Sequence, residues 1–235
     1  MSYTIFVSDV HLSADAPLRT KTFLQFLKAH DDADAIYILG DLFDIWVGDD
    51  EYTEFSKEIK AALSVLKIPH YFIAGNHDFL LSSGFARDTQ LQLLPDPFLA
   101  EIYGQAVLLS HGDIWCTDDL AYQRYRRITR SSILQSLFLM LPFCVRCWIA
   151  HRLQKKSDQV NEKKLSYIME VNEESVVESL DAYQSSILIH GHTHRPMIHT
   201  IAGNKKRIVL GSWEMRGEYL KWNADGQFEL VSGEP

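Results

Sequence analysis

The chain has 235 residues, of which 46% are hydrophobic and 23% charged, with 12 glycines and 7 prolines, so disordered and fibrous classes are excluded. Its three cysteines cannot all pair within one chain, and its first residues lack a basic segment followed by an apolar one, so we expect no signal peptide and a reducing, cytoplasmic compartment. The net charge of −8 would by itself argue against a polyanionic partner, but the uneven distribution of charge along the chain overturns that inference.

The first half of the chain alternates short apolar runs with amphipathic segments. We expect strands at Tyr3–Ser8, Ala35–Leu39 and Tyr71–Ala74, with helices from about Thr20 and over Thr53–Leu66. This alternation is typical of parallel strands joined by crossover helices. Polar residues follow each predicted strand directly, and ligand sites of open α/β sheets form where parallel strands end. A functional site is therefore expected at that edge.

The second half of the chain has a different pattern. A hairpin is expected through Gly104 and Gln105, and the last forty residues favour further strands with a turn at residues 223–226. These strands predict a second, partly antiparallel sheet. Residues 117–186 lose the strand pattern, so we expect a helical cap inserted within a single α/β domain that spans residues 1–235.

Five short clusters of metal-ligating residues are spread along the chain. They are Asp9-Val10-His11, Gly40-Asp41, Gly75-Asn76-His77-Asp78, His111-Gly112-Asp113 and His190-Gly191-His192-Thr193-His194. Carboxylate, amide and imidazole donors without a thiolate suit Mn²⁺, Fe²⁺ or Zn²⁺ in an open site better than a closed structural zinc. The glycines beside these ligands allow the backbone to turn tightly under a metal. The sequence therefore predicts a metal centre built from all five clusters.

The order of the clusters resembles the signature of the calcineurin-like metallophosphoesterases. The resemblance implies a four-layer αββα sandwich with two metals that clamp phosphoryl oxygens. One metal would be held by Asp9, His11, Asp41 and His194, and the other by Asp41, Asn76, His111 and His192. Asp41 would bridge them together with a water that acts as the nucleophile. We expect two Mn²⁺ per chain, with Fe²⁺, Zn²⁺ or Mg²⁺ as alternatives.

Longer stretches at residues 37–50, 111–113, 116–119 and 190–196 resemble the UDP-2,3-diacylglucosamine pyrophosphohydrolase family of lipid A biosynthesis. The resemblance covers nearly the whole chain and implies hydrolysis of a lipid-linked UDP sugar to UMP and 2,3-diacylglucosamine 1-phosphate (lipid X). The candidate catalytic residues are Asp41 and His77. The implied substrate contacts are Asn76, His77, Asp119, Tyr122, Ser157, Asn161, Lys164 and His192. His77 departs from that family, which usually has an arginine there.

The predicted cap has a distinct composition. Residues 120–164 contain ten basic and two acidic residues, a net of +8, so the rest of the chain carries −16. Its uncharged stretch, Ser131–Val145, has 15 residues, which is too short to span a bilayer but suits a surface position. We expect Arg126, Arg127 and Arg130 to face anionic lipids and to attach the protein peripherally to the cytoplasmic face of the inner membrane.

The apolar residues of the cap have two possible roles, lining a cleft for acyl chains or packing the cap onto the body. They are Leu137, Phe138, Leu139, Met140, Leu141, Phe143 and Trp148. A soluble nucleotide diphosphatase or phosphodiesterase is the alternative function, and an inactive binding module is disfavoured by the complete ligand set. We expect no nucleic-acid partner, because the cap's aromatic residues lie within aliphatic runs. We also expect no redox role for Cys144 and Cys147.

Overall fold

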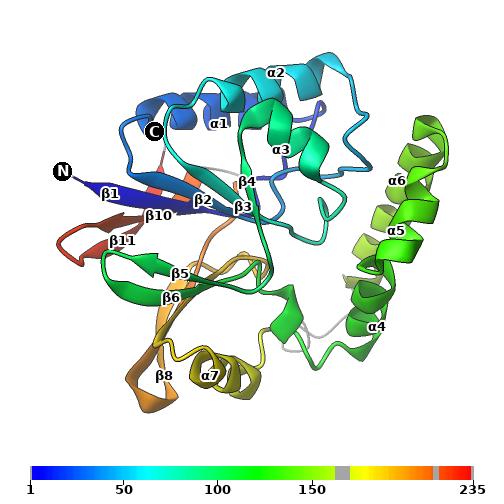
Figure 1. The fold of residues 1–235 in the computed structure, drawn as a ribbon. Coiled ribbons are helices and arrows are strands. Elements are labelled where there is room, and N and C mark those ends of the chain that lie inside the picture. The colour runs from blue at the N-terminus through cyan, green and yellow to red at the C-terminus, as the bar shows by residue number, and fades with distance from the viewer. Residues whose placement is uncertain (1, 162–169, 214–216, 234–235) are drawn as a thin grey trace.

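The computed structural model describes residues 2–161, 170–213 and 217–233, and two β-sheets packed face to face form its centre (Figure 1). The first sheet contains, in spatial order, β11 (Phe228–Gly233), β10 (Gly217–Asn223), β1 (Tyr3–Val7), β2 (Ala35–Leu39), β3 (His70–Ile73) and β4 (Gln92–Leu94). Strands β1 to β4 are parallel, as the alternation of strands and helices predicts.

The second sheet is mixed, which confirms the expected second, partly antiparallel sheet. Its spatial order is β5 (Phe98–Ile102), β6 (Gln105–Leu109), β7 (Ile187–His190), β9 (Lys205–Val209) and β8 (Met197–Ile201). The expected hairpin joins β5 to β6, and β6, β7 and β9 are parallel. The hairpin of β10 and β11 belongs instead to the first sheet, where β10 pairs with β1. Strand β1 is buried along its whole length, so both of its edges need a hydrogen-bonded neighbour.

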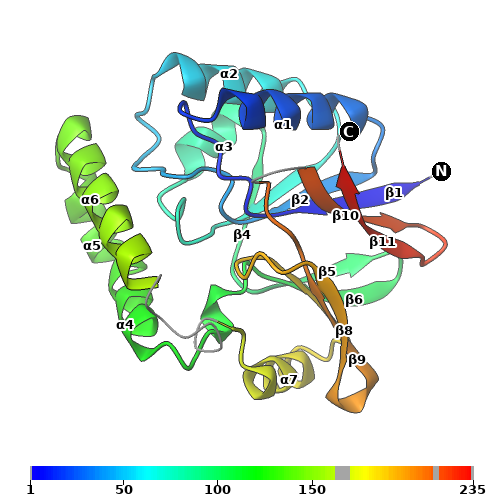
Figure 2. The same ribbon diagram turned by 180° about the vertical axis from the view of Figure 1, so that it is seen from behind.

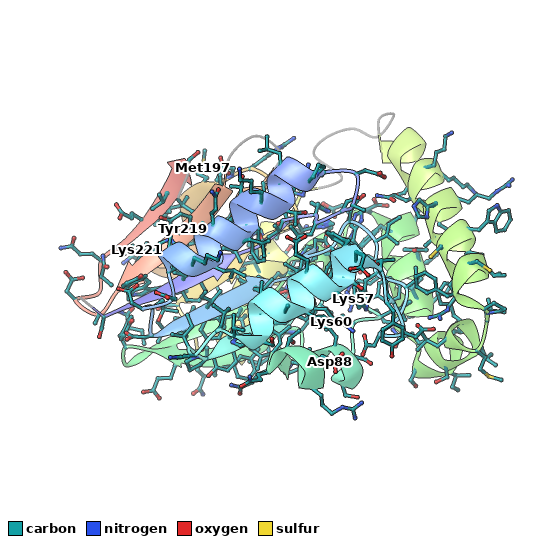
Figure 3. The ribbon with its side chains drawn as sticks, turned by 90° about the horizontal axis from the view of Figure 1, so that it is seen from above. Lys57, Lys60, Asp88, Met197, Tyr219 and Lys221 are labelled. Carbon is teal, nitrogen blue, oxygen red and sulfur yellow. The ribbon has the colours of Figure 1, made fainter. Side chains whose placement is uncertain are left out.

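Helices cover the outer face of each sheet and complete the predicted four-layer αββα sandwich. Helices α1 (Pro17–Ala29), α2 (Glu54–Ser64) and α3 (Ser83–Thr89) cover the first sheet, and α1 and α2 lie side by side when seen from above (Figure 3). Helix α7 (Glu173–Ala182) covers the second sheet (Figure 1). The body also contains two short 3-10 helices, η1 (Asp113–Trp115) and η3 (Ala202–Asn204).

The alternation of side chains along the strands separates two cores. On β1, Ile5 and Val7 point into the core beneath the helices, whereas Phe6 points into the layer between the sheets. On β2, Ile38 points into the core beneath the helices and Leu39 into the layer between the sheets. Both faces of these strands are therefore buried, which explains their continuous apolar runs.

The remaining helices stand beside the sandwich and form the cap. They are α4 (Leu120–Thr129), α5 (Ser132–Leu139) and α6 (Phe143–Asn161), and Figures 1 and 2 show them on one side of the body. Helix α7 also lies within residues 117–186, but its Val176 and Leu180 pack into the body with Leu188. Within the described residues, no helix combines the length and the apolar character needed to cross a bilayer.

A buried arginine ties the cap to the body. Arg146 of α6 donates from Nη1 to the carbonyl of Val47 at 2.6 Å and pairs through Nη2 with the carboxylate of Asp50. Farther along α6, Gln154 donates to Oδ1 of Asp44 at 3.0 Å. Helix α6 of the cap is therefore attached to the loop that follows β2.

Arg146→Ala is expected to loosen the cap without unfolding the sandwich. The change removes hydrogen bonds of a charged group, each worth roughly 1.5–3 kcal/mol, while Asp50 can regain water. Limited proteolysis should cut within residues 120–161 faster than in the wild type, and the melting temperature of the body should change little. Arg152→Ala, at an exposed position of the same helix, is the control. Equal cleavage rates in the two variants would contradict this role of Arg146.

Candidate metal centre

The predicted metal-ligating residues meet at one edge of the two sheets, because each follows the carboxyl end of a strand. Asp9 and His11 follow β1, and Asp41 follows β2. Asn76 and His77 follow β3, His111 follows β6, and His192 and His194 follow β7. Ligand atoms lie within 4.8 Å of one another in three overlapping groups, which are Asp9 with His11 and His194, His11 with Asp41 and His77, and Asp9 with Asp41 and His111.

The backbone at this edge is held in an unusual conformation. Five of the predicted ligands, all non-glycine, adopt a positive φ: Asp9 at 53°, His11 at 51°, Asp41 at 54°, His192 at 69° and His194 at 55°. Such residues cost of order 1–3 kcal/mol each and cluster where function requires them. Backbone hydrogen bonds hold the first loops in place, from the N–H of Asp9 to Gly40 at 3.1 Å and from that of His11 to Asp41 at 2.9 Å.

Asp41 occupies the middle of the site. Its Oδ2 lies 3.9 Å from Nε2 of His11, 4.0 Å from Nε2 of His77 and 3.5 Å from Nε2 of His111. Its Oδ1 accepts a hydrogen bond from the backbone N–H of His77 at 2.9 Å. Burial alone would raise the pKa of Asp41, but the surrounding imidazoles lower it, so the carboxylate is the favoured form.

Asp9 is the second buried carboxylate of the site. Its Oδ2 accepts hydrogen bonds from the Ser8 hydroxyl at 2.6 Å and from the N–H of His192 at 2.9 Å, while Oδ1 lies 3.2 Å from Nε2 of His194. Although burial opposes it, the pKa of Asp9 is lowered by the hydrogen bond with His194 and by the charges of the neighbouring imidazoles. Gly191 packs so tightly here that a Cβ would lie 2.3 Å from the Asp9 carboxylate.

One histidine of the site, His11, has the unpartnered ring nitrogens that a metal would satisfy. His11 is buried, yet neither of its ring nitrogens has a hydrogen-bond partner. His111 has Nδ1 fixed by the carbonyl of Leu39 at 2.9 Å, which leaves Nε2 facing Oδ1 of Asn76 at 3.0 Å. Burial would lower the pKa of His111, but the Asp41 and Asp9 carboxylates raise it to about 9. These nitrogen and oxygen donors fit divalent cations.

Asp78 positions the site, a role that the sequence did not assign to it. Its carboxylate accepts backbone hydrogen bonds from Asp41 at 3.3 Å, Leu42 at 2.6 Å, Phe43 at 3.3 Å and Gly75 at 2.9 Å. It thereby joins the loops after β2 and β3. Burial and the Asp41 carboxylate raise the pKa of Asp78 to about 6. Its position next to His77 in the third cluster was the one sequence feature that could have indicated this role.

One face of α4 leans over the site through residues four positions apart. Tyr122 donates to Oδ2 of Asp113 at 2.6 Å, and its ring centroid lies 5.8 Å from that of His192. Arg126 pairs with Asp113 at 2.8 Å and with Asp96 at 2.9 Å. The next residue on this face, Arg130, reaches the loop after β3.

These contacts correct the expectation that Arg126 and Arg130 face a membrane. Both guanidinium groups are used inside the protein, because Asp113 and the carbonyl of Gly75 lie where α4 meets the body. Arg127 points outward and is exposed. The sequence alone could not show which face of α4 meets the sandwich.

The other predicted substrate contacts lie along the cap. Asp119 is buried and caps α4, where its carboxylate accepts from the N–H of Tyr122 at 3.0 Å. Ser157 is exposed on α6. Asn161 ends α6, but its side chain is not among those described, and Lys164 lies outside the described residues.

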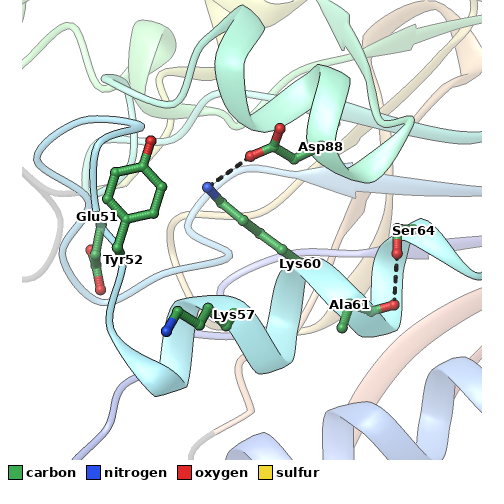
Figure 4. A pocket seen from close by; sticks show the side chains of 7 residues that line it. All are labelled: Glu51, Tyr52, Lys57, Lys60, Ala61, Ser64 and Asp88. Atoms are coloured by element: carbon green, nitrogen blue, oxygen red, sulfur yellow. Dashed lines mark hydrogen bonds and ion pairs between the residues drawn. The ribbon is translucent and has the colours of Figure 1, made fainter.

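A separate hollow lies between α2 and α3, away from the metal-ligating residues (Figure 4). It has a volume of about 420 Å³ and is lined by Glu51, Tyr52, Lys57, Lys60, Ala61, Ser64 and Asp88. Its central cation, Lys60, is paired with Asp88 at 3.0 Å. This hollow contains none of the metal-ligating clusters.

Comparisons with known proteins agree with this geometry. Residues 3–196 match the calcineurin-like phosphoesterase family. The chain is 44% identical, over 97% of its length and 98% of theirs, to UDP-2,3-diacylglucosamine hydrolase of Escherichia coli O7:K1 and to the protein of the same name from Serratia proteamaculans. A solved dimetal phosphatase from Danio rerio has a TM-score of 0.53 at 13% identity, covering 99% of this chain and 96% of that one. An archaeal phosphodiesterase has a TM-score of 0.51 at 12% identity, covering 98% and 99%, and these two likenesses show the fold alone.

We expect Asp41→Ala to reduce metal binding more than any other change at this site. Its carboxylate faces three histidines and belongs to both of the predicted ligand sets, so its loss should affect both metals. After loading with Mn²⁺ and desalting, elemental analysis should find about two ions per wild-type chain and fewer than one per Asp41→Ala chain. His194→Ala should lose about one, and His151→Ala, at an exposed histidine of α6, should lose none. Full metal content in Asp41→Ala would contradict the central role of this carboxylate.

Proposed function

The chain belongs to the calcineurin-like phosphoesterase family and is a metal-dependent hydrolase, and we propose that it cleaves the diphosphate of UDP-2,3-diacylglucosamine to UMP and 2,3-diacylglucosamine 1-phosphate. The observation that carries this proposal is the meeting of Asp and His side chains that could hold a metal ion with a cap that exposes apolar side chains. A soluble nucleotide diphosphatase, the alternative, would need the ligands but not the apolar surface.

The exposure of the cap supports a lipid-linked substrate. Leu137 is 56% exposed, Met140 79% and Trp148 61%, and Leu139 and Leu141 are exposed as well. Among the candidates for an acyl cleft, Phe138 packs against the body and Phe143 is half-buried beneath the guanidinium of Arg146. Packing onto the body therefore accounts for only a minority of these residues. A substrate with two acyl chains requires such an apolar surface next to the reacting phosphate.

We propose two Mn²⁺ in the site, held by the residues that converge there. One set is Asp9, His11, Asp41 and His194, and the other is Asp41, Asn76, His111 and His192. Two such cations supply a water nucleophile near neutral pH and neutralise charge on the phosphate oxygens. The protein keeps these donors oriented through Ser8, Asp78 and the carbonyl of Leu39.

His77 is the residue proposed to assist at the phosphate. Its Nδ1 lies 2.7 Å from the carbonyl of Asp44, which fixes the ring and leaves Nε2 on the side of Asp41. The ring also packs edge-on against His11, with centroids 4.8 Å apart. A protonated His77 held there can donate to a phosphate oxygen or to the leaving group. Asp119, Tyr122, Ser157, Asn161 and Lys164 are the proposed further substrate contacts.

The cap also supports a proposed attachment to the cytoplasmic face of the inner membrane. Its exposed apolar residues accompany exposed cations on α4 and α6, which are Arg124, Arg127, Arg152, Lys155 and Lys156. Apolar insertion and attraction to anionic lipids together give reversible surface binding. The exposed Cys144 and the half-buried Cys147 lie on this surface as free thiols.

Product analysis in ¹⁸O-labelled water tests the reaction. With Mn²⁺ and detergent-dispersed UDP-2,3-diacylglucosamine, we expect UMP and the lipid 1-phosphate, with the label in UMP because water attacks the phosphorus next to uridine. UDP-N-acetylglucosamine, which lacks the acyl chains, should be cleaved at least ~10²-fold more slowly. Comparable rates on the two substrates would favour the soluble alternative, and label in the lipid product would place the attack on the other phosphorus.

Replacing exposed apolar residues of the cap tests their proposed contact with acyl chains. The triple variant Leu137→Ser, Met140→Ser and Trp148→Ser should raise KM for the diacyl substrate at least ~10-fold, since each buried apolar side chain contributes roughly 1.5–3 kcal/mol. Hydrolysis of bis(p-nitrophenyl) phosphate should stay within about twofold of the wild type. Leu18→Ser removes an equally exposed leucine from α1 and is the control. A parallel loss with both substrates would rule out an acyl-specific role.

A further inference from the structure

Arg130, at the carboxyl end of α4, is held at the rim of the metal centre. Its Nη2 donates to the carbonyls of Ala74 at 3.2 Å and Gly75 at 2.9 Å. Its guanidinium carbon lies 5.3 Å from the centre of the Phe79 ring. These contacts come from both ends of the ligand cluster at residues 75–78. They fix the orientation of the planar guanidinium group.

The charge of Arg130 has no carboxylate partner among the described residues. Asp113 is close enough for the two charges to interact, but its Oδ2 is shared by Arg126 at 2.8 Å and the hydroxyl of Tyr122. Its Oδ1 is buried and accepts no hydrogen bond from Arg130 or from any other described residue. A guanidinium has five N–H donors, and within the described part of the chain the hydrogen bonds of Arg130 use Nη2 alone. A half-buried cation with unused donors therefore remains beside the site.

The position of Arg130 places this cation close to the reacting groups. Gly75, whose carbonyl it contacts, is joined directly to Asn76. Gly75 also packs against Asp41 so closely that a Cβ would lie 2.1 Å from the Asp41 carboxylate. One peptide unit therefore separates the carbonyl partner of Arg130 from a proposed metal ligand.

We propose that Arg130 binds a non-bridging oxygen of the substrate's diphosphate, so that the cap contributes a phosphate-binding residue to the site. This inference rests on the proposed function for the identity of the substrate. Arginine is suited to the role, because its planar donors match phosphate oxygens and its charge is permanent. The two carbonyl contacts hold Nη2, and Nε and Nη1 serve the phosphate.

Calorimetric titration of the Mn²⁺-loaded protein with inorganic phosphate tests the inference without the lipid substrate. Arg130→Gln keeps an N–H donor for the two carbonyls but removes the charge, so phosphate should bind roughly 10- to 100-fold more weakly, the range expected for a charge-assisted hydrogen bond. Metal content and melting temperature should not change. Arg127→Gln, at an exposed position of the same helix, should bind phosphate as the wild type does.

The kinetic arm uses the diphosphate substrate, for which kcat/KM of Arg130→Gln should fall by a similar factor. Unchanged phosphate affinity in Arg130→Gln would overturn the inference, as would an equal loss in Arg127→Gln. A loss accompanied by lower metal content or melting temperature would identify Arg130 as a brace of the loop and also overturn it. If the wild type binds phosphate but does not cleave UDP-2,3-diacylglucosamine, the proposed function fails, while the phosphate titration still decides the role of Arg130.

Discussion

The structure depends on two carboxylates, Asp9 and Asp41, that are buried where the sheets meet. Removing a carboxylate from water is costly unless charges and hydrogen bonds replace the solvent. Here the replacement comes from histidines and backbone N–H groups on loops that follow four different strands, β1, β3, β6 and β7. Both sheets must therefore end at the same place and with loops of defined shape, and the positive φ angles of the ligands are part of that shape.

The sequence predicted those parts of the structure that depend on a local pattern of residues with only one physical explanation. The short apolar runs ending in Asp, Asn or His predicted the central parallel strands and the common edge at which the ligands meet. Helix α2 also follows a local rule, because Thr53 caps it and accepts from the N–H of Ser56 at 3.1 Å. Helix α1 begins at Pro17, before the expected Thr20, since proline is favoured in the first turn of a helix.

Long-range choices could not be predicted from the sequence. The hairpin of β10 and β11 could have extended either sheet, and only the need of β1 for a second neighbour decides the matter. The sequence suggests that the arginines of α4 form one positive surface. In the structure Arg126 and Arg130 turn inward, because they bind Asp96 and the carbonyl of Gly75, which lie far from α4 in the sequence. Asp78 was visible in its cluster, but its four backbone partners lie mostly in another loop.

Helix α4 is attached to both halves of the sandwich, because Arg126 binds Asp96 and Asp113, which flank the β5–β6 hairpin of the second sheet, whereas Arg130 binds the loop after β3 of the first. The helix thus acts as a strut across the seam between the sheets. A tilt of this strut must shift the loop of Asn76 relative to that of His111, whose side chains are in contact across the seam. The spacing of the ligands and the orientation of the cap are therefore mechanically linked. A force or a binding partner that moves the cap also changes the geometry of the metal centre.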